Sequence, residues 1–294
     1  MKGQKIITRL TKEIRGWCRD VHHQIERDSG YLQQDLLNPE PTSFNNIASS
    51  LDGLTICWGR LGYMAILDGD AGGWTFIHRS ALYHYWTLRI NLRLYSASWG
   101  TDPTRRTGAY DSISTLCAHL YCYGVLTGLD PIASTSANAL LAIETDGRLQ
   151  NPQFWPVRRY EPFVLALHML DQGKLLPQSI QERDFGVYDA ILRNWVSGDD
   201  VASALTDACE YHCQNMDSRD ADWHQEFRQT PFELIPIEIL AIRRLRARQQ
   251  LATPDIKHPL MESRLADFDA KGAGVEDDTI QDVRKAMIKV FGED

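Results

Sequence analysis

Three residues close together in the sequence carry side chains that zinc prefers as ligands. Cys209, His212 and Cys213 are spaced i, i+3 and i+4, so an α-helix would place all three on one side. A fourth ligand would have to come from a distant segment, and the Cys-x-x-Cys pairs typical of zinc sites are absent. The comparable donors elsewhere are Cys117, His119 and Cys122. The spacing does not decide whether the two groups meet, and it favours core cysteines beside an ordinary histidine, with no metal and no cofactor.

Carboxylates that could bind calcium or magnesium also lack a complete set of partners. Residues 68–73 (Asp-Gly-Asp-Ala-Gly-Gly) begin like the calcium loop of an EF-hand. The fifth position of that loop is Gly72 and the twelfth is Arg79, so the carboxylates required there are missing. The segment is therefore predicted to be a turn between two helices. Acidic residues that begin a terminal helix, where their charge stabilises the helix dipole, are Asp277, Asp278 and Asp282.

The sequence contains none of the common catalytic loops. It has no Gly-x-Ser-x-Gly turn and no phosphate-binding loop ending in Gly-Lys-Ser/Thr. Residues 272–274 lack the third glycine of a dinucleotide-binding loop and follow no predicted strand. We therefore expect a protein that is not an enzyme. The alternative is an all-α enzyme with a pocket assembled from distant side chains, such as Asp68, Asp70, His78, His84 and Glu161.

Apolar residues recur at helical spacing through most of the chain. Within residues 7–25 they lie three or four positions apart, with charged side chains between them, and Gly30 is the predicted stop. The alternation typical of strands is nearly absent. The sequence predicts an all-α fold, a single multi-helix domain over 1–294 with about ten helices, with a subdivision near 146–160 or a stack of helix pairs as alternatives. The expected helices include residues 44–65, 74–99, 110–127, 185–196, 199–216 and 237–245.

Composition and charge narrow the functional classes. Hydrophobic residues make up 43% of the chain and charged residues 24%, which indicates a packed core. The net charge of −8 argues against nucleic-acid binding, which needs a basic surface, and suits a basic protein partner. Six cysteines in 294 residues indicate reduced thiols of a cytoplasmic protein. No signal peptide is recognised, and the longest apolar stretch, residues 163–170, is too short to span a membrane.

Negative charge is concentrated in one part of the chain. Residues 199–226 contain eight acidic residues and one arginine, a net charge of −7 out of −8 for the whole chain. The simple interpretation is a solvated acidic helix beside a solvated basic helix, which carries four arginines between residues 243 and 248. The alternative is a contact surface for a cationic partner, with an aromatic anchor. The side chains of this predicted contact surface are Asp199, Asp200, Asp207, Glu210, Asp217, Asp220, Asp222, Trp223 and Glu226.

Three segments between residues 188 and 260 resemble a known family. They are Tyr188–Trp195 (YDAILRNW), which leads into Gly198-Asp199, then Phe232–Ala241 (FELIPIEILA), and His258–Leu260 (HPL). They resemble the large all-helical immunity proteins of bacterial polymorphic-toxin systems, particularly the immunity protein 49 type. The resemblance implies a cytosolic, non-enzymatic inhibitor that binds and blocks a cognate toxin delivered by a neighbouring cell, as in type VI secretion and interbacterial competition. It implies no particular site residues.

Three hypotheses follow from the sequence. The first is an immunity protein whose acidic run contacts a toxin through a basic surface of that toxin. The second is the all-α enzyme described above, and the third is a helical scaffold or regulatory protein of solenoid type.

Overall fold

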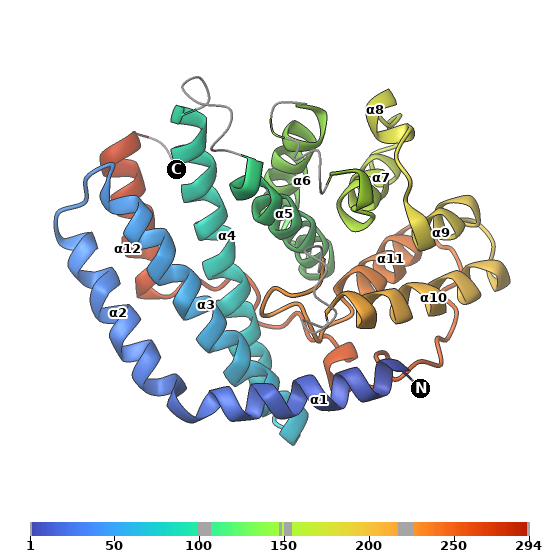
Figure 1. Cartoon of the computed structure of the whole chain (residues 1–294), viewed down its shortest axis with the longest axis horizontal. Coiled ribbons are helices and arrows are strands. Elements are labelled where there is room, and N and C mark those ends of the chain that lie inside the picture. The colour runs from blue at the N-terminus through green and yellow to red at the C-terminus, as the bar shows by residue number, and fades with distance from the viewer. Residues whose placement is uncertain (1, 99–106, 147–148, 150–154, 217–225, 293–294) are drawn as a thin grey trace. The chain divides into compact units, whose positions relative to one another are not determined.

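A computed structural model of the chain describes residues 2–98, 107–146, 149, 155–216 and 226–292 (Figure 1). In these residues every regular element is an α-helix or a short 3-10 helix, and none is a strand. The prediction of an all-α fold is therefore confirmed. Among the same residues, no helix is both long enough and apolar enough to cross a membrane.

The chain divides into two compact units, each assembled from segments that are distant in the sequence. The first unit contains Met1–Leu10 and Asp102–Asp267, and the second contains Thr11–Thr101 and Phe268–Asp294. Helix α1 (Lys2–Trp17) therefore begins in the first unit and ends in the second. The predicted subdivision near 146–160 falls inside the first unit, and the prediction of one domain stays a prediction.

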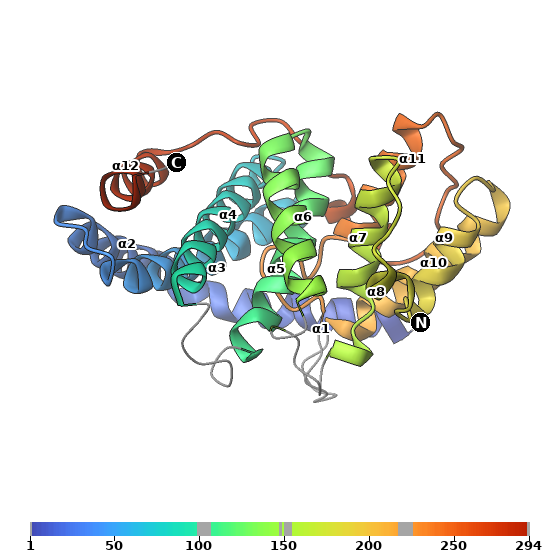
Figure 2. The same cartoon turned by 90° about the horizontal axis from the view of Figure 1, so that it is seen from above.

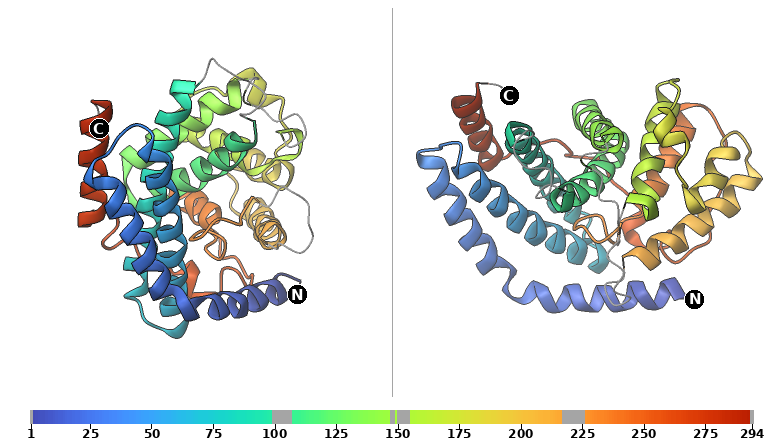
Figure 3. Two further views of the ribbon diagram at one scale, coloured as in Figure 1. Left: turned by 60° about the vertical axis from the view of Figure 1, so that its left-hand side comes forward. Right: turned by 45° about the horizontal axis from the view of Figure 1, so that its top comes forward.

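The second unit is built on a helical hairpin. Helices α3 (Ser43–Asp68) and α4 (Gly73–Ser98) pack along each other, and α2 (Val21–Leu37) also packs along α3 (Figures 1 and 3). Helix α12 (Asp278–Phe291) packs against α2 and α4. Helix α3 ends at Asp68, and Gly69 follows it with a φ of 99°, a conformation that glycine adopts without strain. The predicted turn at residues 68–73 is confirmed.

Gly30 does not end the first helical segment, so that prediction is wrong. The helix expected over residues 7–25 is two helices, α1 and α2, joined by the 3-10 helix Cys18–Asp20, and α2 continues to Leu37. An exposed glycine weakens a helix by about 1 kcal/mol. Burial of Leu32 just beyond Gly30 outweighs this loss, because tertiary packing supplies most helical stability in a folded protein.

The first unit is a group of helices around α5 (Thr107–Thr127). Residues 113–125 of α5 are all buried, since the helix is apolar on every side. It packs against α6 (Asp130–Thr145), α7 (Tyr160–Asp171) and α11 (Ile237–Arg248), and Figure 2 shows α5 and α6 side by side. The other helices are η3 (Trp155–Val157), α8 (Gln178–Gln181), η4 (Gly186–Tyr188), α9 (Asp189–Arg193), α10 (Asp199–Asn215) and η5 (Arg264–Ala266).

The helix predicted over residues 185–196 is only partly formed. The structure has the short helices η4 and α9 there, and the helix ends at Arg193. Gly186 has a φ of 57°, and its N–H donates to the Asp184 carboxylate at 2.8 Å. This tight turn competes with a regular helix, because a short acidic side chain offers the backbone an alternative hydrogen bond.

The close approach of α3 and α4 gives a stability prediction. A Cβ atom at Gly62 would lie 2.7 Å from Ile77 Cδ1 and 2.9 Å from the Gly73 carbonyl oxygen. We expect Gly62→Ala to lower the free energy of unfolding by about 1–3 kcal/mol, because the hairpin has no room for a methyl group. Gly30→Ala in the same unit, where nothing lies within 4 Å, should raise it by about 0.5–1 kcal/mol. Urea denaturation of both variants checks this, and a stabilised Gly62→Ala would contradict it.

Candidate functional site

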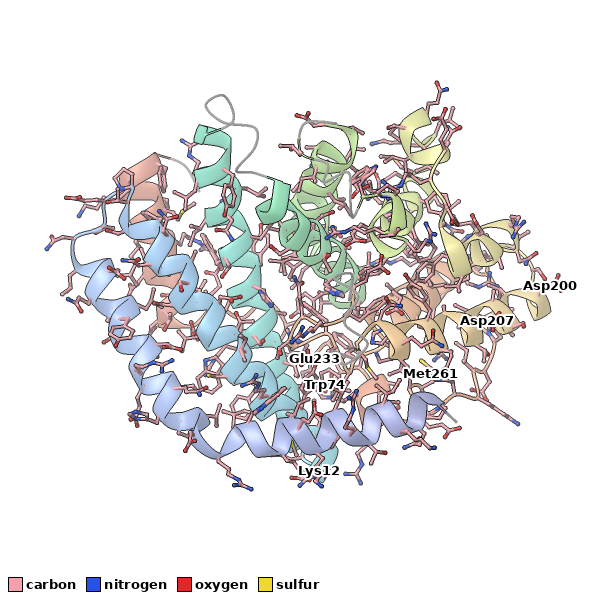
Figure 4. The ribbon with its side chains drawn as sticks, in the orientation of Figure 1. Lys12, Trp74, Asp200, Asp207, Glu233 and Met261 are labelled. Atoms are coloured by element: carbon pink, nitrogen blue, oxygen red, sulfur yellow. The ribbon has the colours of Figure 1, made fainter. Side chains whose placement is uncertain are left out.

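The structure describes four of the nine side chains in the predicted contact surface. Asp200 and Asp207 are exposed and lie on α10, Asp200 near its N-terminal end (Figure 4). They are seven residues apart, so they share one side of the helix. Glu210 and Glu226 have other surroundings, described below. The Asp199 side chain and residues Asp217, Asp220, Asp222 and Trp223 lie outside the described residues.

Other residues of the first unit cover part of the Glu210 side chain. The backbone N–H of Leu260 donates to His258 Nδ1 at 3.1 Å, so Nε2 carries the ring proton. That Nε2 lies 3.4 Å from Glu210 Oε2. A Cβ atom at Gly3 of α1 would lie 3.1 Å from the same oxygen, so α1 covers part of Glu210. Among the described residues of the predicted contact surface, the acidic side chains on the exposed side of α10 are therefore Asp200 and Asp207.

Glu226 is not a surface residue, which corrects its place in the predicted contact surface. Only 3% of it is exposed. Its carboxylate accepts hydrogen bonds from the backbone N–H groups of Arg159 (2.6 Å) and Tyr160 (3.1 Å), and from the Tyr211 hydroxyl. The first N–H groups of a helix have no partner within the helix and attract an anion, so Glu226 caps α7. Burial, followed by the negative charge of Glu161, raises the pKa of Glu226 to about 8.

The three residues with side chains that zinc prefers belong to the core. Cys209, His212 and Cys213 are all buried. His212 Nε2 donates to the Glu233 carbonyl at 3.0 Å, and Nδ1 lies 3.0 Å from both carboxylate oxygens of Glu238. One proton therefore lies between the imidazole and the carboxylate, and this buried pair joins α10 to α11. Burial raises the pKa of Cys213 to about 12, so its thiol stays protonated at neutral pH.

An aromatic ring lies between the donor group that contains His119 and the donor group that contains His212. Tyr160 OH lies 3.2 Å from His119 Nδ1 and donates weakly to Cys122 Sγ at 3.6 Å. The Phe227 ring contacts the rings of both histidines, with centroids 5.7 Å from His119 and 4.0 Å from His212. Within the described residues, no group of three or more such donors is placed to hold a metal ion.

A buried network of carboxylates and arginines lies where α5, α6 and α7 meet. Thr115 Oγ1 donates to Glu161, and Arg158 Nη1 lies 3.3 Å from the same carboxylate. Ser114 Oγ donates to Glu144 at 3.1 Å, and Arg183 Nη1 lies 3.5 Å from Glu144 Oε2. We call Glu144, Arg158, Glu161, Arg183 and Glu226 the carboxylate–arginine cluster.

The guanidinium of Arg183 closes one side of the carboxylate–arginine cluster. It lies 4.1 Å from the centroid of the Trp155 ring. It also donates to the Trp155 carbonyl and, at 3.3 Å, to the Arg158 carbonyl. Both Glu144 and Glu161 have fully buried side chains. Burial, followed by the charge of Glu161, raises the pKa of Glu144 to about 8.

The residues suggested for a dispersed enzyme pocket have separate local partners. Asp68, Asp70, His78 and His84 belong to the second unit, whereas Glu161 belongs to the first. Their neighbours differ: Arg15 for Asp68, the Gly72 N–H for Asp70, the Asp269 carbonyl for His78, and Asp52, at 3.9 Å, for His84. Burial lowers the pKa of His78, which favours a neutral ring that donates to the carbonyl.

Arg246 corrects the prediction of a solvated basic helix. Arg244 and Arg248 are exposed, whereas Arg246 is fully buried. Its guanidinium donates to the carbonyls of Trp195, Ser197 and Ala252. The sequence spacing could have predicted this burial, because Arg246 lies four residues after Ile242 and seven after Ile239, both of which are buried.

Glu238 is another buried charged residue that the sequence did not predict. It is a lone acid inside the apolar run Ile237–Leu240 and is fully buried. A charged residue in such an apolar run is seldom fully buried without a partner, so the sequence pattern could have predicted that Glu238 is paired.

Comparison of the chain with protein-family models, with curated proteins and with solved structures finds no match in any of the three.

Proposed function

We propose that this chain binds and neutralises a cognate bacterial toxin in the cytoplasm, as an immunity protein does, without catalysis. The proposal starts from the family resemblance of three segments between residues 188 and 260. The observation that carries it is the two-sided character of α10. Contacts with those three segments hold its inner side, through polar groups for two of them and through an aromatic ring for the third, and its outer side presents acidic side chains.

The inner contacts involve each of the resembling segments in turn. The His212–Glu238 pair ties α10 to the Phe232–Ala241 segment, and His258 ties Glu210 to the His258–Leu260 segment. The Tyr188–Trp195 segment contacts α10 through the ring of Tyr188, whose centroid lies 5.7 Å from that of Tyr211. These contacts fix α10 before any partner binds, which lowers the entropic cost of association.

The outer side of α10 suits a cationic partner. Residues 199–216 contain no lysine or arginine, so no positive charge of the helix offsets Asp200 and Asp207. Seven residues at 1.5 Å per residue place the two carboxylates roughly 10 Å apart along the axis. Exposed charges of one sign mainly accelerate encounter with a partner of opposite sign and set its salt dependence.

The first experiment identifies the partner. The tagged chain is expressed in its native bacterium and isolated at low and at moderate salt. The proposal expects one stoichiometric protein that arrests growth when produced alone and is harmless when produced with this chain. A partner that is not toxic, or a toxin that stays active with the chain bound, would contradict the proposed function.

Charge reversal then tests the surface. We expect Asp200→Lys with Asp207→Lys to lower the association rate constant for that toxin at low salt roughly tenfold. Glu26→Lys with Glu40→Lys, at exposed positions of the second unit, changes the net charge equally and serves as the control. Stopped-flow or surface-binding kinetics measure both. Equal rates for the two variants would remove the outer side of α10 as the contact.

A further inference from the structure

Two helices carry exposed side chains of opposite charge at the same spacing. On α1 these are Lys5, Thr8 and Lys12, and on α10 they are Asp200, Ser203 and Asp207. Both sets occupy positions i, i+3 and i+7, so each set forms a stripe along one side of its helix. We call them the lysine stripe and the aspartate stripe. Figure 4 shows Lys12 on α1, and Asp200 and Asp207 on α10.

We propose that two copies of this chain associate through the lysine stripe of one copy and the aspartate stripe of the other. The occupant of each stripe is therefore a second copy of the chain. The inference does not rest on the proposed function, because it uses only the charges of the two helices and their spacing. Under the proposed function, a toxin and a second copy compete for the same two aspartates.

The charges of the two stripes match in their separation. In each stripe the two charged residues are seven positions apart, which is roughly 10 Å along the helix axis at about 1.5 Å per residue. Two helices that lie side by side can therefore pair both lysines with both aspartates at once. Thr8 and Ser203 lie between the charges, and their short side chains allow the two helices to approach each other.

The lysine stripe lies on a basic helix in an acidic chain. Residues 2–17 contain five basic residues and one acidic residue, whereas the whole chain has a net charge of −8. The acidic residue, Glu13, is half-buried and does not belong to the stripe. Because Lys5 and Lys12 are exposed, this side of α1 presents positive charge to a partner.

Neutral groups hold the start of the aspartate stripe in place. Ser197 Oγ donates to Asp200 Oδ2 at 3.0 Å and accepts from the Asp200 N–H at 3.3 Å. Residues 199–216 contain no lysine or arginine. Within the part of the chain that the structure describes, none of the four charged side chains of the two stripes forms an ion pair. Both stripes therefore keep their charge for a partner.

The contacts of α1 within one copy leave the lysine stripe open. A Cβ atom at Gly3 would lie 3.1 Å from Glu210 Oε2 and 3.2 Å from Cys213 Sγ, so this side of α1 packs against α10. Lys5 follows Gly3 by two residues, which is about 200° around a helix of about 3.6 residues per turn. The lysine stripe therefore points away from α10 of its own copy, and the aspartate stripe that meets it belongs to another copy.

The contact between copies is expected to be weak and sensitive to salt. Exposed ion pairs contribute little each, and dissolved salt screens them. The contact joins two different surfaces, so a dimer linked by one contact can add further copies at its two open stripes. Self-association should therefore increase with protein concentration at low salt and disappear at moderate salt.

Sedimentation velocity of the chain alone tests the proposal. At about 10 mM salt, where the Debye length is roughly 30 Å, the weight-average sedimentation coefficient should rise with protein concentration. At about 300 mM salt it should stay at the monomer value, because the charges are then screened. Lys5→Glu with Lys12→Glu, and Asp200→Lys with Asp207→Lys, should each raise the dissociation constant at low salt at least about tenfold, because like charges then face each other.

An equimolar mixture of these two variants separates the proposed contact from general effects of net charge. The first variant keeps the aspartate stripe and the second keeps the lysine stripe. The mixture should associate at low salt as the unmodified chain does, although neither variant does so alone. Two control variants change the net charge equally at exposed positions outside both stripes and should behave like the unmodified chain. They are Lys257→Glu with Lys271→Glu, and Glu26→Lys with Glu40→Lys.

An unmodified chain that stays monomeric at low salt overturns the proposal, and this result does not depend on any variant folding. A mixture that fails to associate, although circular dichroism shows both variants folded, overturns it as well. If a monomeric chain binds vesicles of phosphatidylcholine with phosphatidylglycerol, and Lys5→Glu with Lys12→Glu removes that binding, the lysine stripe belongs to an anionic lipid surface instead. No toxin enters these measurements, so their failure and the failure of the proposed function are separate results.

Discussion

Replacing Glu238 by leucine is expected to lower the free energy of unfolding by about 3–5 kcal/mol, because it leaves the imidazole of a buried imidazole–carboxylate pair without its partner. The His212 and Glu238 side chains both have no exposed surface, and their contact joins α10 to α11. After the substitution, Nδ1 of His212 would be buried without the carboxylate that it now contacts. Urea denaturation followed by circular dichroism measures the loss.

A double-mutant cycle separates this pair from a simple packing effect. His212→Leu alone should also destabilise the chain, since Glu238 and the Glu233 carbonyl would lose a donor. The double variant His212→Leu with Glu238→Leu should lose much less than the sum of the two single losses, because neither polar partner is then left buried without the other. Additive losses would show that the pair is not coupled. Asp207→Leu, on the exposed side of α10, is the control and should change stability by no more than about 0.5 kcal/mol.

Replacing Arg246 by methionine is expected to cost about 3–5 kcal/mol, although methionine fills a similar volume. The guanidinium donates to three carbonyl groups, of Trp195, Ser197 and Ala252, which belong to two separate turns. Methionine has no hydrogen-bond donor and would fill the space of the guanidinium, so these carbonyls would lose their hydrogen bonds. The turn that leads into α10 should then loosen.

The matched control for Arg246 lies two residues earlier on the same helix. Arg244 is exposed, and Arg244→Met should change the free energy of unfolding by no more than about 0.5 kcal/mol. Hydrogen exchange should show faster exchange of the amides in residues 195–200 only in the Arg246 variant. Equal stability of the Arg246 and Arg244 variants would mean that the buried guanidinium contributes nothing to holding the turns.

Local pattern was sufficient for the class of fold and for most helices. The apolar spacing from residue 44 to 65 predicted α3 (Ser43–Asp68), and the glycine-rich turn after it was recognised at the right place. Spacing also placed Cys209, His212 and Cys213 on one buried side of a helix. These features depend on residues within one or two turns of each other, so the sequence carries them directly.

The candidate site was predicted only in part, because charge counts do not tell which charges face water. The run 199–226 correctly identified an acidic stretch, and Asp207 is exposed as expected. Glu226 belongs to the same run and is buried, since its partners are the α7 N-terminus, 66 and 67 residues away, and Tyr211. No local pattern marks a carboxylate that caps a distant helix.

The sequence by itself determined the all-α class, the acidic character of one region and the buried side of α10. Only the tertiary structure decided the pairing of His212 with Glu238, the burial of Arg246 and the grouping of Glu144 with Arg183. The physical reason is the range of the interactions. Helical periodicity is set by hydrogen bonds four residues apart, whereas a buried charge is stable only beside partners that folding brings from elsewhere in the chain.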